Sequence, residues 1–407
     1  MLPDGWRRST LGEIARITSG GTPDRSEPSY WGGSVPWVTT GEIQFNTITD
    51  TAEKITEAGL KNSSAKLFPP GTLLMAMYGQ GKTRGQVAKL AIEASTNQNS
   101  AAILLHEGHD PDFYFQYLWW KYDEIREFGH SGGISHLNAG LLKQIAVPVA
   151  PLDEQRRIAR MLKTWDDAIS LADRLTQSAK ALSGSLIRRA FAVDVFGGNW
   201  PSVPLADVAT CSVSNVDKKS LVGERSIRLC NYTDVYYSNR IDSSMPFMAA
   251  TASEKEIAKF ALQVGDVVIT KDSETASDIA VAARVTEPVD QLICGYHLAL
   301  IRPKREYINA EYLHAYFGLP RTRDYFFASA SGVTRFGLST QAIQDAPVPI
   351  APLDLQDRIA DLVLSGEDLL RRCRDRAAVL RVEKAALMAE LLAGKRRVRL
   401  PAAETAP

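Results

Sequence analysis

One glycine-rich loop carries the side chains with the clearest capacity for chemistry. The segment Gly79–Gly85 reads Gly-Gln-Gly-Lys-Thr-Arg-Gly and fits a relaxed phosphate-loop pattern after a strand-like run. A phosphate loop needs a helix directly after it, and Gly85 is a poor start for one. The same side chains suit nucleic acid, because Gln and Arg pair with adenine and guanine edges while Lys and Thr suit phosphates. Both interpretations stay open from this segment alone.

Other loops carry polar and aromatic side chains of the same kinds, in both halves of the chain. In the first half the candidate nucleic-acid contacts are Gln80, Lys82, Thr83, Arg84, Gln98, Asn99, His136 and Asn138. In the second half they are Asn231, Tyr232, Lys271, Ser273, Thr275, Tyr296, His297, Thr334 and Arg335. Residues of these types are also common in ordinary turns, and that is the alternative at each single position.

Patterns typical of catalysis or metal binding are missing from the sequence. It contains no HExxH, no GxSxG and no Asn/Asp-Pro-Pro-aromatic tetrapeptide, and its six histidines lack the spacing of metal ligands. Its four cysteines are widely spaced and form no CxxC pair. These observations favour a binding protein over an enzyme, with no metal or cofactor of its own.

Composition sets the class of protein. The 407 residues suggest two to four domains, and 45% apolar with 23% charged residues is typical of globular proteins. The 47 basic and 47 acidic groups cancel, which excludes a strongly basic nucleic-acid domain but allows local basic faces. No apolar run is long enough for a membrane helix, and the first residues lack the apolar segment of a secretory signal. We therefore expect a cytoplasmic protein.

An internal repeat organises the chain. Val147–Ala159 reads VPVAPLDEQRRIA and Val348–Ala360 reads VPIAPLDLQDRIA. Weaker similarity continues upstream, where Gly5–Ile17 matches Asn199–Cys211. The chain is thus two copies of one unit, each a globular segment, a proline-marked junction and a helical segment.

Each junction leads into a predicted helix of about 40 residues, long enough to span ~60 Å. In the first helix nine successive heptad positions are apolar: Ile158, Met161, Trp165, Ala168, Ala172, Leu175, Ala179, Leu182 and Leu186. In the second, Gly366 interrupts the stripe. We predict an antiparallel coiled coil of the two helices. The alternative is that each amphipathic helix packs on its own globular segment.

We therefore expect an α/β (α+β) fold with a pseudo-twofold internal repeat. The mixed globular segments are 1–150 and 196–351, the helices are 151–195 and 352–394, and 395–407 is a basic, flexible tail. Strands are expected at Ser34–Thr40, Thr72–Met77, Ala101–Leu105 and Asp266–Thr270, and helices at Asp112–Phe128 and Ala310–Phe317.

Together these features resemble the specificity subunits of Type I restriction-modification systems. The resemblance covers nearly the whole chain, from Pro3-Asp-Gly-Trp6 and Leu11-Gly-Glu-Ile14 through Gly71 to Pro-Leu-Asp-Glu-Gln-Arg-Arg-Ile-Ala at 151–159 and its copy at 352–360. It implies two target-recognition domains that each read half of a split site in double-stranded DNA, held apart by the coiled coil. The second junction departs from the first, since Leu355 and Asp357 replace Glu154 and Arg156.

The resemblance also implies partners. The helices would dock two modification (methyltransferase) subunits, with restriction/translocase subunits joining them, and S-adenosylmethionine, ATP and Mg would belong to those partners. The junction residues expected to bind the partner are Asp153, Glu154, Gln155, Arg157, Ile158, Asp354, Gln356, Arg358 and Ile359. Two alternatives remain: a coiled-coil scaffold without a DNA role, and a nucleotide-binding enzyme that uses Gly81-Lys82-Thr83.

Overall fold

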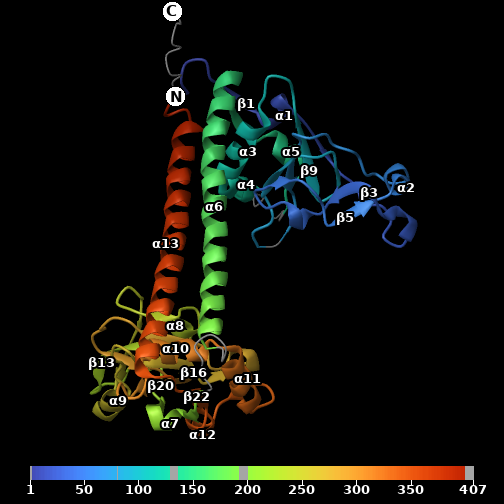
Figure 1. Ribbon diagram of the computed structural model, residues 1–407. Helices are drawn as coiled ribbons and strands as arrows, with labels where there is room; N and C mark the ends of the chain where they lie inside the picture. The colour runs from blue at the N-terminus through green and yellow to red at the C-terminus, as the bar shows by residue number, and fades with distance from the viewer. Residues whose placement is uncertain (1, 80, 129–135, 192–199, 399–407) are drawn as a thin grey trace, which may run out of the picture. The chain divides into compact units, whose positions relative to one another are not determined.

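The computed structural model describes residues 2–79, 81–128, 136–191 and 200–398. The chain divides into two compact units. Unit 1 contains residues 1–173 and 375–407, and unit 2 contains residues 174–374. Each unit therefore combines a globular segment with parts of both long helices, α6 (Leu152–Ala190) and α13 (Leu353–Leu391) (Figure 1).

Unit 1 contains a five-stranded sheet in the order β2-β9-β6-β7-β4, a three-stranded sheet β5-β3-β8 and a two-stranded sheet β1-β10. The strands are β1 (Arg7–Thr10), β2 (Ala15–Ser19), β3 (Trp31–Val38), β4 (Thr47–Ile48), β5 (Glu53–Ile55), β6 (Leu73–Ala76), β7 (Val87–Leu90), β8 (Ser95–Thr96), β9 (Ser100–Leu105) and β10 (Ala146–Val149). The short helices are α1 (Leu11–Ile14), η1 (Pro28–Tyr30), η2 (Thr40–Glu42), α2 (Glu57–Lys61), α3 (Pro111–Trp120), α4 (Tyr122–Phe128) and α5 (Ala139–Lys143).

Unit 2 repeats this plan with sheets β12-β20-β16-β18-β14, β15-β13-β19 and β11-β22, and among the described residues it also contains the pair β17-β21. Its strands are β11 (Ser202–Pro204), β12 (Ala209–Val213), β13 (Arg225–Cys230), β14 (Arg240–Ile241), β15 (Met248–Ala252), β16 (Val267–Thr270), β17 (Asp272–Ser273), β18 (Ala282–Val285), β19 (Leu292–Cys294), β20 (Leu298–Pro303), β21 (Phe336–Gly337) and β22 (Pro347–Pro349). Its short helices are α7 (Leu205–Val208), α8 (Tyr232–Tyr236), α9 (Glu254–Phe260), η3 (Ala276–Asp278), α10 (Ala310–Phe317), α11 (Pro320–Ser329) and α12 (Thr340–Gln344).

The two units share strand order and strand direction. The edge strand β4 runs parallel to β7, and its counterpart β14 runs parallel to β18, while the inner pairs of both large sheets are antiparallel. The central strands β6 and β16 are buried along their whole length, as their unbroken apolar runs predict. The predicted duplicated α/β architecture is confirmed.

The predicted strands all form, within a few residues. The predicted helix over Asp112–Phe128 is two helices, because α3 ends at Trp120 and α4 begins at Tyr122. Asp110 caps α3 by accepting a hydrogen bond from the Phe113 amide. The cap fixes the start of α3, which carries the side chains that meet α6.

The first turns of each long helix pack on the globular segment that precedes them. Ile158 and Leu162 of α6 belong to the core of unit 1, and Ile359 and Val363 of α13 belong to that of unit 2. The alternative of amphipathic helices packed on their own segments is thus correct for these turns. The end of α13 closes the unit 1 core through Met388.

Beyond those turns the helices pack on each other within each unit. In unit 1, Asp166 of α6 pairs with Lys384 of α13 at 2.5 Å, and Asp173 pairs with Arg381 at 2.6 Å. As residue numbers rise along α6 the partners' numbers fall along α13, so the helices are antiparallel, as predicted. Ala172 of this seam packs against Ala377 and Leu380.

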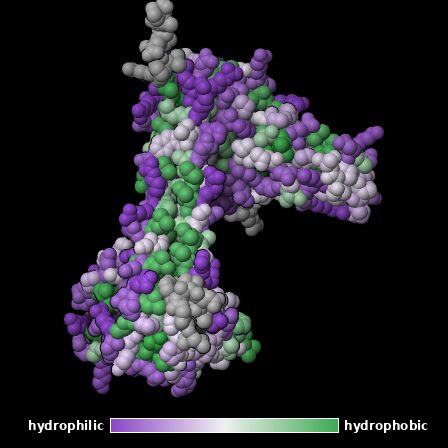
Figure 2. Space-filling view, viewed as in Figure 1, coloured by the Kyte–Doolittle hydropathy of each residue, from purple (hydrophilic) through white to green (hydrophobic). Residues whose placement is uncertain are grey.

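The predicted apolar stripe is only partly correct. Ala172 and Ala179 are buried, but Met161, Leu175 and Leu182 are exposed. A straight α-helix has 3.6 residues per turn, whereas a heptad repeat assumes 3.5. Residues at heptad positions therefore drift around the helix, and only some of them face the other helix. Apolar side chains consequently reach the surface along the long helices (Figure 2).

Gly366 does not interrupt α13, which continues through it. A Cβ atom at this position would lie 2.5 Å from the Ser183 hydroxyl oxygen of α6. Gly366 is therefore the close-approach point of the two helices in unit 2. Among the described residues, no helix is both long enough and apolar enough to cross a membrane.

Candidate functional site

Three loops meet at one edge of the large sheet in each unit, and we call this place the loop edge. In unit 1 the Met77 amide donates to the Asn99 carbonyl at 2.9 Å, and the Leu137 amide donates to the Met77 carbonyl at 2.9 Å. In unit 2 the Lys271 amide donates to the His297 carbonyl at 2.8 Å and the Leu338 amide to the Lys271 carbonyl at 3.0 Å. The same backbone pattern thus gathers equivalent loops in both units.

The loop edge of unit 1 presents amides and rings. The His136 ring stacks on Tyr78, with ring centroids 4.9 Å apart and planes inclined by 9°. Gln98 is exposed and accepts a hydrogen bond from the Thr22 hydroxyl. Asn99 is half-buried, and Thr83 lies half-buried in the glycine-rich loop. Tyr78 was not among the predicted residues.

Two predicted contacts in unit 1 have structural partners instead. Arg84 is buried and donates to the Arg126 carbonyl at 3.4 Å, which ties the glycine-rich loop to the end of α4. Asn138 caps α5 by accepting from the Leu141 amide at 3.0 Å. Lys82 is exposed, with its carbonyl held by the Tyr122 hydroxyl, and Gln80 lies outside the described residues.

The glycine-rich loop is not a phosphate loop. After Thr83 the chain turns and enters strand β7, and the Gly85 amide returns to the Ala76 carbonyl at 2.8 Å. No helix begins there, so the aligned amides and helix dipole that hold phosphates are missing from this segment. The nucleotide-binding alternative therefore loses its only structural basis.

The loop edge of unit 2 brings several predicted residues into one ionic cluster. Asp272 accepts from His297 Nδ1 at 2.9 Å and from Lys271 Nζ at 3.0 Å. Arg335 lies against the His297 ring, with one guanidinium nitrogen 3.1 Å from Nε2 and 3.2 Å from Nδ1. Tyr296 contacts the same ring, at a centroid separation of 3.9 Å. We call Lys271, Asp272, His297 and Arg335 the ionic cluster.

Electrostatics hold Asp272 ionised in this cluster. Partial burial raises the pKa of its carboxyl, but hydrogen bonds from His297 and Lys271 outweigh burial and hold the pKa below its usual value. The sequence offered a signal for Asp272 that composition alone hides, since it is the repeat counterpart of Tyr78.

The other predicted residues of unit 2 divide between support and surface. Asn231 caps α8, and buried Ser273 accepts from the Thr275 amide at 3.3 Å. Tyr232 stacks on Tyr236 and contacts the Ser273 hydroxyl at 3.3 Å. Thr275 and Thr334 are exposed.

The junctions share one buried glutamine with the same partners. Gln155 Oε1 accepts from the Asp110 amide at 2.8 Å, and its Nε2 donates to the Ala150 carbonyl at 2.7 Å. Gln356 bonds the Asn309 amide and the Ala351 carbonyl, both at 2.8 Å. The repeated Gln thus ties each helix start to the loop before α3 or α10.

The residue before that glutamine differs in chemistry. Glu154 is 2% exposed, accepts from Trp6 Nε1 at 3.0 Å and pairs with Arg397 at 2.6 and 2.9 Å. The prediction of a free basic tail is wrong for Arg397, which is fixed on unit 1. Its counterpart Leu355 is buried in the apolar core of unit 2.

The junction residues predicted to bind a partner are mostly internal. Glu154, Gln155, Ile158, Gln356 and Ile359 are buried, whereas Asp153, Asp354 and Arg358 are exposed and Arg157 is half-buried. The buried members shape the junction, and only the exposed members are accessible to another protein.

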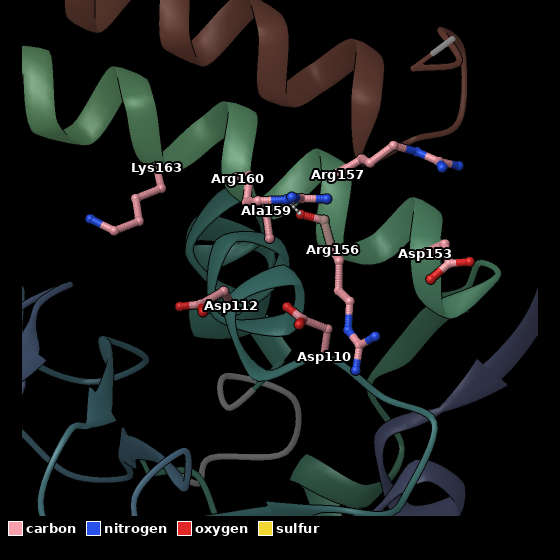
Figure 3. Close-up of a pocket in the computed structure, with 8 residues that line it drawn as sticks. All are labelled: Asp110, Asp112, Asp153, Arg156, Arg157, Ala159, Arg160 and Lys163. Carbon is pink, nitrogen blue, oxygen red and sulfur yellow. Dashed lines mark hydrogen bonds between the residues drawn. The ribbon is translucent and has the colours of Figure 1, made fainter. Parts of the chain in front are cut away.

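A charged groove of about 580 Å³ lies beside the first junction (Figure 3). One wall is α6, with Arg156, Arg157, Arg160 and Lys163. Asp110 and Asp112, at the start of α3, face it across the groove, and Arg156 extends towards Asp110 (Figure 3). The corresponding positions on α13 carry Asp357, Arg358, Asp361 and Leu364.

Comparisons with known proteins bear on the whole chain. A family model described as the Type I restriction modification DNA specificity domain matches residues 3–181. The MjaVIII specificity subunit of Methanocaldococcus jannaschii is 20% identical over 421 residues, covering 98% of this chain and 94% of that protein. The MjaIX specificity subunit of the same organism is 26% identical over 173 residues, which are 41% of this chain but only 39% of the relative's length.

A solved structure shows the same fold across both units. The Type I restriction-modification S subunit from M. genitalium aligns with a TM-score of 0.59 at 14% identity, covering 96% of this chain and 98% of that one. Over both units the chain is similar to specificity subunits of Type I restriction-modification systems.

The two loop edges occupy equivalent places in the two units but present different side chains. Among the described residues, no three His, Cys, Asp or Glu side chains lie close enough together to hold a metal ion.

Proposed function

We propose that this chain selects a bipartite site in double-stranded DNA for a Type I restriction-modification complex. The globular segments 1–150 and 196–351 are the target-recognition domains, and each reads one half-site through its loop edge. The observation that carries this proposal is the same backbone gathering three loops in both units while the exposed side chains differ. The chain itself contributes no catalytic group.

The side chains at the loop edges support readout of bases. Gln98 and Asn99 supply amides in unit 1, and Arg335 supplies a guanidinium in unit 2. Amides form paired hydrogen bonds with adenine and guanidinium groups form them with guanine. Phosphate contacts position a protein on DNA, and Lys and Thr side chains suit them. The candidates here are Lys82, Lys271, Thr83, Thr275 and Thr334.

We further propose that the helices set the gap between half-sites and dock two modification subunits. The charged groove beside α6 and the corresponding face of α13 provide exposed surfaces for them, including Asp153, Asp354 and Arg358. Those subunits and the restriction/translocase subunits would supply S-adenosylmethionine, ATP and Mg. The complex would act in the cytoplasm, where its DNA substrate lies.

The chain's zero net charge predicts its behaviour without partners. Affinity for DNA depends mainly on neutralised phosphates, so the isolated chain should bind weakly and lose binding steeply as salt rises. Gel-shift titrations at several salt concentrations, with and without modification subunits, test this. Full affinity in the isolated chain would contradict it.

The decisive experiment maps methylated positions across the genome of a host with and without this gene. We expect one bipartite motif to lose methylation upon deletion and to regain it upon complementation. A complementing chain shortened by two heptads in both helices should change the gap and keep both half-sites. Unchanged methylation after deletion would overturn the proposed function, and a scaffold without a DNA role would remain.

A further inference from the structure

One short loop of unit 2 is built to present its side chains. Residues 331–337 read Ser-Gly-Val-Thr-Arg-Phe-Gly. Two backbone hydrogen bonds close the loop, from the Ser331 amide to the Gly337 carbonyl at 3.1 Å and back at 2.9 Å. Gly332 has φ of 139°, and a Cβ atom there would overlap the Arg335 carbonyl oxygen. Only glycine permits this closure.

The closed loop exposes an apolar side chain beside a basic one. Val333 is 93% exposed, and Thr334 and Arg335 are exposed with it. A lone, fully solvated Val at a rigid loop tip has no role in the core. A Val side chain fits the methyl group of thymine, and a guanidinium fits the O6 and N7 atoms of guanine.

The guanidinium of Arg335 is held by a relay from the body of unit 2. The bond between His297 Nδ1 and Asp272 at 2.9 Å fixes the imidazole ring, and one guanidinium nitrogen of Arg335 lies against this ring, 3.1 Å from Nε2 and 3.2 Å from Nδ1. Strand β17 bonds to β21, so Asp272 and the base of the loop are fixed to each other. His297 adopts φ of 72°, in the left-handed region that a non-glycine residue occupies at an energetic cost.

The charges around Arg335 leave it able to bind another acceptor. Asp272 already serves Lys271 and His297, and no carboxylate of the described chain forms an ion pair with Arg335. A guanidinium has five N–H donors, and the contact with His297 leaves donors unused. A guanine edge would supply the two acceptors needed.

We infer that Arg335 determines specificity by reading one guanine in the half-site of unit 2, and that His297 is the positioning residue for its guanidinium. This inference rests on the proposed function and names the base contact within it. A phosphate could bind the same guanidinium, but the fixed orientation and the exposed Val333 beside it favour a base edge. A phosphate contact is therefore a distinct outcome of the test.

The experiment uses the full complex with its modification subunits and a duplex library in which every base pair of both half-sites is varied. In Arg335→Ala, we expect discrimination at one G·C pair of one half-site to fall roughly 10- to 100-fold. The other half-site should keep its preferences. Lys255→Gln removes an exposed positive charge elsewhere in unit 2 and serves as the matched control.

Two further variants separate positioning from simple structural support. His297→Gly suits the left-handed backbone but lacks the ring against which the guanidinium lies, so it should relax selectivity at the same base pair. His297→Asn tolerates that backbone and keeps a planar polar side chain, so it should retain part of the selectivity. Thermal unfolding of each variant confirms that unit 2 is folded.

The possible results are distinct. A loss of affinity that is equal for all sequences, with a shallower salt dependence, would identify a phosphate contact and overturn the inference. Unchanged selectivity in Arg335→Ala would also overturn it, while the wild-type complex still showed the proposed function. If the wild-type complex selected no bipartite site, the proposed function itself would fail.

Discussion

The two junctions solve one structural problem with different chemistry. Gln155 and Gln356 make matching hydrogen bonds and tie each globular segment to the start of its long helix. The preceding position is free to diverge, and it holds a buried, paired Glu154 in unit 1 but an apolar Leu355 in unit 2. What differs is whether the C-terminal segment of the chain supplies a cation, as Arg397 does for Glu154.

Placing the residue of one junction at the other should have the largest effect on stability. Leu355→Glu would bury a carboxylate in an apolar core with no cation, so we expect unit 2 to lose about 3–5 kcal/mol of unfolding free energy. Urea unfolding followed by proteolysis, with peptides assigned to each unit, measures this. A loss below about 1 kcal/mol would show that position 355 is not enclosed as the structure indicates.

The reverse exchange, Glu154→Leu, should cost less. It leaves Trp6 Nε1 without its acceptor, but Arg397 is partly exposed and can be solvated, so about 1–3 kcal/mol is expected in unit 1. Adding Arg397→Met should recover part of that loss. If the double variant had a lower unfolding free energy than Glu154→Leu alone, the pairing of the two residues would be contradicted.

Acid stability should separate the two units next. His314 of α10 is largely buried, and burial, aided by the nearby Arg284, lowers its pKa from 6.5 to about 4. Unfolded His314 takes up a proton near pH 6.5 while the folded form does so only near pH 4. The unfolding free energy of unit 2 should therefore fall as pH drops through this window, by at most about 3 kcal/mol.

The groups facing His314 determine the net slope. Glu367 lies 3.9 Å from its Nδ1, and burial raises the pKa of that carboxyl against the opposing charge of Arg284. Glu367 therefore takes up a proton more readily in the folded state and partly offsets the loss. The corresponding α3 position in unit 1 holds Phe115, so His314→Phe should remove the histidine contribution. An unchanged pH slope in that variant would contradict the assignment.

Sequence patterns predicted what is local and repeated, and missed what is distant. Caps, apolar runs and the duplicated motif predicted the strands, the helices and the position of both junctions. The Glu154–Arg397 pair joins residues 243 positions apart, and no local pattern indicates it. Gly366 was interpreted as a flaw in a heptad stripe, because its role depends on Ser183 of another helix.

At the site, sequence identified types of residue but not their roles. Lys271, His297 and Arg335 were predicted as contacts and lie together, yet Asp272, which joins two of them, was missed. Arg84 and Asn138 were also predicted as contacts, and each forms a hydrogen bond with the backbone of unit 1. Side-chain orientation decides such roles, and it follows from tertiary packing that composition does not encode.

A milder change tests the close approach of the helices. Gly366→Ala places a Cβ 2.5 Å from the Ser183 hydroxyl oxygen and 3.0 Å from its Cβ, so one helix must shift. We expect unit 2 to lose about 1–2 kcal/mol, since strain exceeds the ~1 kcal/mol gain in helix propensity. The control Ala181→Gly lowers helix propensity at an exposed α6 position of unit 2 without adding bulk. Unit 2 unfolding under urea reports the loss, and a stabilised Gly366→Ala would show that the helices are farther apart.

The smallest effect concerns the outer faces of the two junctions. Arg156 and Arg160 are exposed on α6, whereas their counterparts on α13 are the exposed Asp357 and Asp361. Two copies of one modification subunit would present the same surface to both faces, so a charged patch on it would attract one face and repel the other. We therefore expect the two copies to bind with unequal affinities. The difference between the two affinities should decrease as salt screens the charges.

Exchanging the charges of the two faces tests this expectation directly. Arg156→Asp with Arg160→Asp makes the first face like the second, and Asp357→Arg with Asp361→Arg does the converse. Exposed charges contribute up to about 1 kcal/mol each, so the two stepwise affinities should converge by roughly fivefold or more in either variant. Native mass spectrometry and titration calorimetry of the assembly measure both steps. Equal stepwise affinities in the wild-type chain would show that the partner contacts only features common to both junctions, such as Asp153 and Asp354.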